Sequence, residues 1–226
     1  MKRILFITST RIGDAVISTG VLKALVDQNP DAAFTVVCGP LAAPLFAAVP
    51  RLERVIPLRK RKFDLHWFDL WRQVRAHEWD TVIDIRNSFL SFFLKARVRR
   101  VVGRMDHRPR IVSLPSVIGL DRPLDPHVYV DARHRDIAAE IVPDGEPVLA
   151  LGPVASLPEK TWPAQRFVAL MRLLLGAGGP CEGWRAAAFG GPGDEAVAEE
   201  VLAEIPAARD RKSTRLNSSH ITISYA

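Results

Sequence analysis

The 226-residue sequence lacks the short motifs that mark several common enzyme classes. It has no GxxxxGK[S/T] loop, no GxGxxG after its first apolar segment, and no HExxH, CxxC or GxSxG pattern. These absences weigh against P-loop chemistry, dinucleotide-dependent oxidoreduction, zinc proteolysis and serine hydrolysis. There is also no Asp-x-Asp pair of the kind that often holds a metal ion against a sugar nucleotide.

The sequence is poor in metal ligands with useful spacing. Its two cysteines, Cys38 and Cys181, lie far apart, and its histidines show no ligand pattern. The sequence therefore predicts no metal site and no bound cofactor. So few cysteines fit a reducing compartment.

Long apolar runs are missing as well. Lys2-Arg3 is followed by only four strongly apolar residues before Thr8, too few for a secretory signal, and no run is long enough to span a bilayer. We expect a soluble, cytoplasmic protein, at most bound to the surface of a membrane.

Basic residues, in contrast, are concentrated in one part of the chain. Residues 51–110 carry 16 basic and 7 acidic side chains. Such a stretch suits an anionic partner, which is nucleic acid, anionic lipid or a phosphorylated substrate. A solvated basic face would have the same composition.

Apolar segments with strand and helix periods alternate along the chain. Strands are predicted at residues 2–9, 33–38, 55–58, 81–85, 98–102 (as an edge strand), 148–151 and 185–189. Helices are predicted at residues 13–28, 41–49, 65–76, 88–95, 129–141, 162–175 and 194–205, and residues 109–126 are rich in turn formers. The alternation restarts after the linker PDGEP at 143–147. This order predicts an α/β protein with two Rossmann-like domains, residues 1–146 and 147–210, each with a parallel sheet.

The last 16 residues, 211–226 (RKSTRLNSSHITISYA), differ from the rest of the chain. They show no helix or strand period before Ile221, and they resemble the peptide translated from a common sequencing adapter. We interpret them as a non-native, disordered tail. A genuine Ser- and Asn-rich disordered terminus is the alternative.

The most informative residue is Asp14. It lies just after the first predicted strand, at the start of the first predicted helix, where open α/β sheets bind ligands. The positive end of a helix dipole favours a negative charge there, and a carboxylate at such a place can accept a proton from a substrate hydroxyl. An acid that merely caps the helix is the alternative.

Two further segments suit the binding of a nucleotide. SLPEKTW at 156–162 follows the first strand of the second domain, and its Lys160 is a candidate contact for a diphosphate, or else a surface lysine. GGPGDE at 190–195 is a glycine-rich turn before a helix, which suits either phosphate binding or an ordinary strand–helix connection. Trp67, Trp71 and Trp79 are interpreted as core residues.

Taken together, these segments resemble the ADP-heptose:lipopolysaccharide heptosyltransferases of glycosyltransferase family 9. The matching elements are RILFI with Gly13-Asp14, WDTVIDIR at 79–86, KTWP at 160–163 followed by Phe167, and GGPGD at 190–194. Their order and spacing cover nearly all of residues 1–210.

The resemblance implies a GT-B fold, an inverting glycosyltransferase that needs no metal, ADP-heptose as the donor and the anionic glycolipid of the lipopolysaccharide inner core as the acceptor. It implies no nucleic-acid partner and allows peripheral contact with the inner membrane. By resemblance, Asp14 is the catalytic base. The donor-binding residues would be Ser156, Lys160, Gly190, Gly191 and Asp194, and the acceptor-binding residues would be Ser9, Thr10, Arg11, Lys60 and Arg61.

The sequence departs from this family in its second domain. A further donor motif of the Asp-x-Gly-x-x-His type is absent, so the domain is expected to be incomplete and the chain as written to be poorly stable and inactive. Three alternatives stay open: a transferase that uses another sugar nucleotide or acceptor, a non-catalytic nucleotide-binding module, and a dinucleotide-dependent oxidoreductase.

Overall fold

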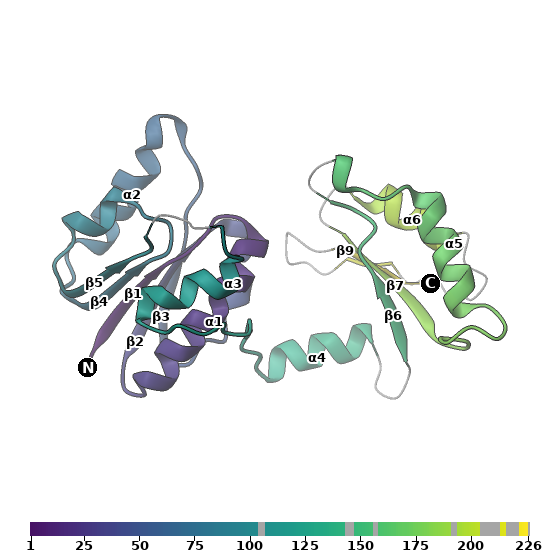
Figure 1. The fold of residues 1–226 in the computed structure, drawn as a ribbon, viewed down its shortest axis with the longest axis horizontal. Helices are drawn as coiled ribbons and strands as arrows, with labels where there is room; N and C mark the ends of the chain where they lie inside the picture. Colours follow the sequence, from purple (N-terminus) through teal and green to yellow (C-terminus); the bar gives the residue numbers. More distant parts are fainter. Residues whose placement is uncertain are drawn as a thin grey trace. The chain divides into compact units, whose positions relative to one another are not determined.

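The structure is a computed structural model, which describes residues 1–103, 107–142, 147–155, 158–190, 194–203, 213–215 and 222–225. It divides into two compact units, Met1–Asp131 and Ala132–Ala226 (Figure 1). The division falls before the predicted boundary at residues 146/147. The reason is that Ile137 and Val142, at and just after the helix that follows Asp131, pack against Ala187 of the second unit.

The first unit is built on a five-stranded parallel sheet with the order β3-β2-β1-β4-β5. The strands are β1 (Arg3–Ile7), β2 (Ala33–Cys38), β3 (Leu52–Pro57), β4 (Trp79–Asp84) and β5 (Ala96–Val101). All five occur where the sequence predicts a strand. β5 lies at an edge of the sheet, as its charged sequence ARVRRV indicates.

Helices and short turns connect these strands. The α-helices are α1 (Ile12–Gln28), α2 (Leu65–Val74) and α3 (Arg110–Ser113), and the 3₁₀ helices are η1 (Pro40–Phe46), η2 (Lys62–Asp64), η3 (Phe89–Phe93) and η4 (Leu114–Ile118). Two predicted helices, at 41–49 and 88–95, are thus 3₁₀ turns. In the first of them, Pro44 cannot donate a backbone hydrogen bond. In the part of the chain that the structure describes, no helix is both long and apolar enough to cross a bilayer.

Alternate residues of the strands pack on opposite faces of the sheet. Ile4, Phe6 and Phe34 lie in the core under α1, whereas Leu5 and Ile7 lie in a second core with α2. This is the pattern of a parallel sheet that is buried on both faces. The predicted core tryptophan Trp79 is 1% exposed, and its Nε1 donates a hydrogen bond to the Val74 carbonyl oxygen at 3.1 Å; Trp67 and Trp71 pack at the edge of the same core.

The burial of Cys38 in the core under α1 can be tested through the chemistry of its thiol. The side chain is fully buried, and burial raises the pKa of its thiol from 9.0 to about 12. Its contribution to stability is therefore complete below pH 9 and falls as the pH rises towards 12, where the unfolded chain loses the proton first.

At neutral pH, we expect iodoacetamide to label Cys181, which is partly exposed, and to spare Cys38 until the chain unfolds. Mass spectrometry of native and urea-unfolded samples measures this difference. Rapid labelling of native Cys38 would contradict the core described above.

The second unit contains a smaller α/β core. β6 (Val148–Leu151) pairs in parallel with β7 (Arg185–Gly190), and the helices are α4 (Ala132–Ile141), η5 (Pro158–Lys160), α5 (Ala164–Leu175) and α6 (Glu195–Ala203). Val168, Met171 and Val201 pack against Ala186 and Ala188 of β7. The strand–helix–strand–helix order that the sequence predicts after the linker is therefore present.

The structure describes residues 213–215 and 222–225 of the tail, and the disorder and non-native origin of the tail stay a prediction. Two short strands, β8 (Ser213–Arg215) and β9 (Thr222–Tyr225), form an antiparallel pair, and β9 pairs with β7. The second sheet, with the order β6-β7-β9-β8, is thus mixed and not wholly parallel. The pairing has a simple reason: without β9, the edge of β7 would leave backbone groups unpaired, and the β9 sequence, TISY, is rich in residues that favour strands.

Candidate functional site

The first sheet reverses its winding direction between β1 and β4. From β1 the chain builds outwards through β2 and β3, whereas β4 and β5 lie on the other side. Ile7 lies beside Asp84 in the register, and the Ile85 backbone nitrogen donates a hydrogen bond to the Ile7 carbonyl oxygen at 2.9 Å. Ligands of open α/β sheets bind at such a switch point, beyond the carboxyl ends of the strands.

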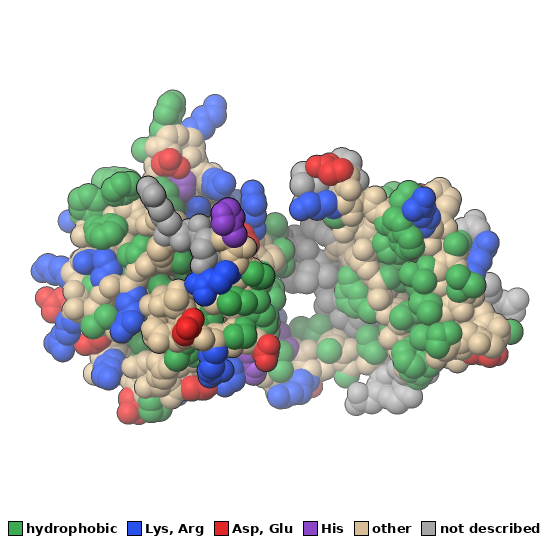
Figure 2. Space-filling view, in the orientation of Figure 1, with side chains coloured by type: hydrophobic (Ala, Val, Ile, Leu, Met, Phe, Trp, Pro, Cys, Tyr) green, Lys and Arg blue, Asp and Glu red, His purple; other side chains and the backbone are tan. Residues whose placement is uncertain are grey.

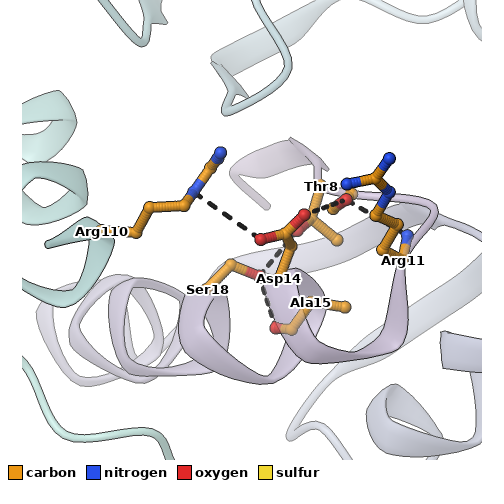
Figure 3. Close-up of polar contacts among 7 residues, drawn as sticks. Thr8, Arg11, Asp14, Ala15, Ser18 and Arg110 are labelled. Atoms are coloured by element: carbon orange, nitrogen blue, oxygen red, sulfur yellow. Dashed lines mark hydrogen bonds and ion pairs between the residues drawn. The ribbon is translucent and has the colours of Figure 1, made fainter. Parts of the chain in front are cut away.

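The loop from β1 to α1 is held by its own hydroxyl groups. Thr8 Oγ1 and Ser18 Oγ are 2.6 Å apart, and Ser9 Oγ accepts a hydrogen bond from the Arg11 backbone nitrogen at 3.2 Å. Ser9 Oγ also faces the Asp14 carboxylate, with 3.4 Å between Oγ and Oδ2. The loop therefore fixes the position from which Asp14 projects (Figure 3).

Asp14 lies in the first turn of α1 and not at its N-cap position. The N-cap residue of α1 is Arg11, whose side chain makes no capping hydrogen bond. The carboxylate instead lies between the β1–α1 loop and Arg110 of α3, whose Nε is 3.9 Å from Asp14 Oδ1 (Figure 3). With 29% of its side chain exposed, Asp14 remains accessible to a ligand.

A second loop reaches the site from the end of β4 and is held by a buried carboxylate. Asp84 is fully buried and accepts hydrogen bonds from the backbone nitrogens of Arg86 and Ser88, both at 2.9 Å, and from Ser88 Oγ at 2.5 Å. Burial raises the pKa of Asp84, and these hydrogen bonds oppose the shift. Asn87 takes a left-handed conformation (φ 54°), which asparagine tolerates better than most residues.

Arg86 brings a partly desolvated positive charge to the same place. Its guanidinium carbon lies 5.1 Å from the centre of the Trp67 ring, and its Nη1 is buried without a hydrogen-bond partner among the described residues. Burial lowers the pKa of Arg86, while the negative charges of Asp84 and Asp64 oppose this. A buried donor of this kind favours an anionic ligand.

These loops line a cavity of about 370 Å³. Among the described residues, its charged lining consists of four cations and one carboxylate, namely Arg11, Lys60, Arg86, Arg110 and Asp14. The predicted residues Ser9, Thr10, Arg11, Lys60 and Asp14 thus lie together. Arg61 is not in this lining, and its Nη1 pairs with Asp69 Oδ2 at 2.5 Å.

Four polar residues were not predicted as functional: Asp84, which holds the loop after β4, and Arg86, Asn87 and Arg110 of the cavity lining. A signal for the first two was present, since a polar DIR sequence ends an otherwise apolar strand. Arg110 had no such signal, because it lies in a segment rich in turn formers that the structure folds into α3.

A larger hollow of about 520 Å³ lies at the opposite end of the strands, around Arg3, Asp80 and Arg97. Each of its three basic side chains lies within 4.0 Å of a carboxylate, Arg3 of Glu53, Lys95 of Glu78 and Arg97 of Asp80. The Arg3 backbone nitrogen donates to Asp80 Oδ2 at 2.9 Å, and Arg97 Nη1 is 3.5 Å from Asp80 Oδ1. We therefore place the candidate site at the carboxyl ends of the strands.

The predicted donor-binding residues lie in the second unit. Ser156 and Gly191 are outside the described residues, and Lys160 ends η5 with an exposed side chain. Gly190 ends β7 close to Asp194, since a Cβ on Gly190 would be 3.0 Å from the Asp194 Cβ. Thr161, Trp162 and Pro163 line a separate hollow of about 610 Å³ with α6. Within the described residues, no three His, Cys, Asp or Glu side chains are grouped so as to hold a metal ion.

Gly39 offers a test of how closely the site is packed. A Cβ on this residue would lie 2.2 Å from the Thr10 carbonyl oxygen, whereas a Cβ on Gly13 would meet nothing within 4 Å. We expect Gly39→Ala to displace the β1–α1 loop and to cost about 1–3 kcal/mol in the free energy of unfolding. Gly13→Ala, the matched control, should be neutral or slightly stabilising. Urea unfolding measures both, and equal stabilities of the two variants would show that the loop is loosely packed.

The chain was compared with known proteins. No protein-family profile and no curated protein matches the sequence. Solved structures do match. A glycosyl transferase of family 9 from Veillonella parvula DSM 2008 has a TM-score of 0.72 at 19% identity, over 91% of this chain and 67% of the other. E. coli ADP-heptose LPS heptosyltransferase II has a TM-score of 0.67 at 20% identity, over 91% and 69%. E. coli heptosyltransferase WaaC with ADP has a TM-score of 0.60 at 17% identity, over 91% and 73%.

The chain shares their fold. The predicted α/β architecture is thereby confirmed, and the match in fold agrees with the family resemblance of the motifs. This chain corresponds to about 67–73% of the length of these three structures. At 17–20% identity the likeness concerns the fold, so activity is argued below from the site.

Proposed function

We propose that the chain is part of a glycosyltransferase that transfers heptose from ADP-heptose to the anionic inner core of lipopolysaccharide. The observation that supports this most strongly is the carboxylate of Asp14, which lies at the switch point of the first sheet among four cations of the described cavity lining. A carboxylate suits proton abstraction, and the cations suit an acceptor that carries carboxylates or phosphates.

In this proposal Asp14 accepts the proton of the attacking acceptor hydroxyl. The acceptor oxygen then forms a bond to the anomeric carbon of the sugar, the bond from that carbon to the diphosphate breaks, and ADP leaves. Attack from the face opposite the leaving group inverts the anomeric configuration. Arg86 and Arg110 would hold anionic groups of the acceptor, since both line the cavity beside Asp14.

The donor is assigned to the second unit. Lys160 would meet the negative charge that develops on the diphosphate, with Ser156, Gly190, Gly191 and Asp194 near the nucleotide. The structure of WaaC with ADP-2-deoxy-2-fluoro heptose, which has a TM-score of 0.61 at 17% identity, supports the choice of donor class. We place this protein on the cytoplasmic side of the membrane, where its donor would be available.

The test measures binding and transfer separately. Inner-core acceptor is titrated into the 226-residue chain by calorimetry. Transfer is followed as ADP release and product mass with the whole enzyme of which this chain is proposed to be a part. We expect acceptor binding in the chain and heptose transfer in the whole enzyme. Transfer from another nucleotide sugar only would reassign the donor. Nucleotide binding without any transfer would indicate a non-catalytic module, and NAD binding would indicate an oxidoreductase.

A further inference from the structure

Residues 59–62, with the sequence RKRK, form a basic loop between β3 and the η2–α2 segment. All four side chains are exposed, and of the four only Lys60 belongs to the described lining of the cavity beside Asp14. Figure 2 shows blue Lys and Arg side chains and a red acidic side chain close together at the end of the first unit where this loop lies. Fixing a lysine at one place on an exposed loop costs conformational entropy, so other contacts must hold the loop.

Arg61 supplies such contacts through both its backbone and its side chain. Its backbone nitrogen donates a hydrogen bond to His66 Nδ1 at 3.3 Å, and its Nη1 lies 2.5 Å from Asp69 Oδ2. His66 is 4% exposed, so packing fixes its ring within α2. His66 and Asp69 are three residues apart on one helix and are therefore neighbours on its surface. We call these two contacts with α2 the Arg61 clamp.

The backbone after Arg61 has an unusual conformation. Phe63 and Asp64 both have left-handed angles, with φ of 56° and 53°. Such angles are uncommon in residues other than glycine, and in a bulky residue they persist only where surrounding contacts fix them. The turn at these residues brings Arg61 back to α2, where its partners follow it in the sequence by five and eight positions. The Arg61 clamp therefore closes a strained turn.

The same end of α2 also holds a second cation of the cavity. The guanidinium of Arg86 lies over the ring of Trp67, as described above, and the rings of Trp67 and His66 are 5.1 Å apart between their centres. α2 thus supports Arg86 through an aromatic ring and the basic loop through the Arg61 clamp.

We propose that Arg61 is a positioning residue, which clamps the basic loop on α2 and so holds Lys60 at the cavity, while the acceptor contacts Lys60 and not Arg61. This inference rests on the proposed function, and it gives Arg61 a different role from the acceptor binding that the resemblance implies. The charge of Arg61 is already met by Asp69, so an acceptor anion would have to displace that carboxylate.

The Arg61 clamp can be tested without any ligand. Endoproteinase Lys-C cleaves after Lys60 and Lys62, and the substitutions Asp69→Ala and His66→Phe leave this cleaved sequence unchanged. We expect each of them to raise the initial rate of loop cleavage in the native 226-residue chain about two- to fivefold, because an exposed ion pair or a single hydrogen bond is lost. Mass spectrometry measures the rate. Arg72→Ala, an exposed change on α2, is the matched control and should leave the rate unchanged.

Binding of the inner-core acceptor tests the link to Lys60. In calorimetry on the 226-residue chain, we expect Arg61→Ala and Asp69→Ala each to weaken binding about two- to fivefold, and the double variant to bind about as well as either single variant. Removing the negative charge of Asp69 would by itself favour an anion, so weaker binding reports a lost position. In a chain that carries Lys60→Ala, Asp69→Ala should have no further effect.

Two measurements separate positioning from a general loss of structure. An unfolded fraction would lower the number of binding sites in calorimetry, whereas loss of the Arg61 clamp should change the affinity and leave that number unchanged. In the whole enzyme, Asp69→Ala should raise KM for the acceptor and leave kcat unchanged.

The proposal is overturned if Asp69→Ala leaves the rate of loop cleavage unchanged. It is also overturned if Asp69→Ala binds the acceptor as tightly as the unsubstituted chain or more tightly, while Arg61→Ala loses about tenfold or more, since an arginine that contacts the acceptor directly would give this result. If the unsubstituted chain binds no acceptor, the proposed function is contradicted, and faster cleavage of Asp69→Ala would still support the Arg61 clamp.

Discussion

Replacing Asp14 by Asn is expected to lower the rate of heptose transfer by the whole enzyme about 100- to 10,000-fold, because an amide cannot accept the proton of the acceptor hydroxyl. The substitution keeps the size of the side chain and its contact with Ser9. Acceptor affinity should be retained or should rise, since a negative charge is removed from a cavity that binds anions. Turnover and calorimetric affinity, measured on the same preparation, test both parts.

Asp31→Asn is the control for this substitution, because Asp31 is exposed outside the cavity. It should leave the rate of transfer unchanged. If Asp14→Asn retains full turnover, Asp14 is not the base. If it loses acceptor binding and turnover in equal proportion, Asp14 is a binding residue.

Replacing Asp84 by Ala is expected to destabilise the first unit by about 3 kcal/mol or more. The change leaves the buried backbone N–H group of Ser88, the partly buried one of Arg86 and the Ser88 hydroxyl without their acceptor. The Arg86 side chain should lose its position as the loop relaxes, so anionic ligands should bind more weakly. Urea unfolding and acceptor titration measure the two effects.

The free energy of unfolding of Asp84→Asn should lie between those of the unsubstituted chain and Asp84→Ala, because the amide oxygen of asparagine can still accept a hydrogen bond from one N–H. The difference in stability should also depend on pH. Burial raises the pKa of Asp84 above the usual value for an aspartate. The contribution of this residue to the stability of the fold is therefore complete at a pH below the usual pKa, and it declines as the pH rises through the raised pKa. A loss for Asp84→Ala no greater than that of the exposed control Asp121→Ala would contradict this account.

The parallel sheet of the first unit was predictable because its strands are short apolar runs separated by clear helical periods. Residues 33–38 were predicted to the residue as β2. The 3₁₀ turns η1 and η3 were not, since an apolar run of this length fits a helix as well. The strands of the tail were missed because β9 pairs with the edge of β7, and this pairing is not encoded within the tail itself.

The site was predictable where its residues follow the first strand. Ser9, Thr10, Arg11 and Asp14 lie together for that reason. Arg86 and Arg110 come from distant segments that the winding of the sheet brings to the same end, and their nearness to Asp14 depends on topology rather than on spacing. Arg61, which the resemblance places with the acceptor-binding residues, is not in the cavity lining, and its guanidinium pairs with Asp69.

The most direct measurement for the central claim is a crystal structure of the 226-residue chain with the inner-core acceptor bound. We expect one acceptor hydroxyl to lie within about 3.2 Å of an Asp14 carboxylate oxygen. We also expect Arg86 Nη1 to donate a hydrogen bond to an acceptor carboxylate or phosphate. An acceptor bound elsewhere on the chain, or bound in the cavity with no hydroxyl near Asp14, would contradict it.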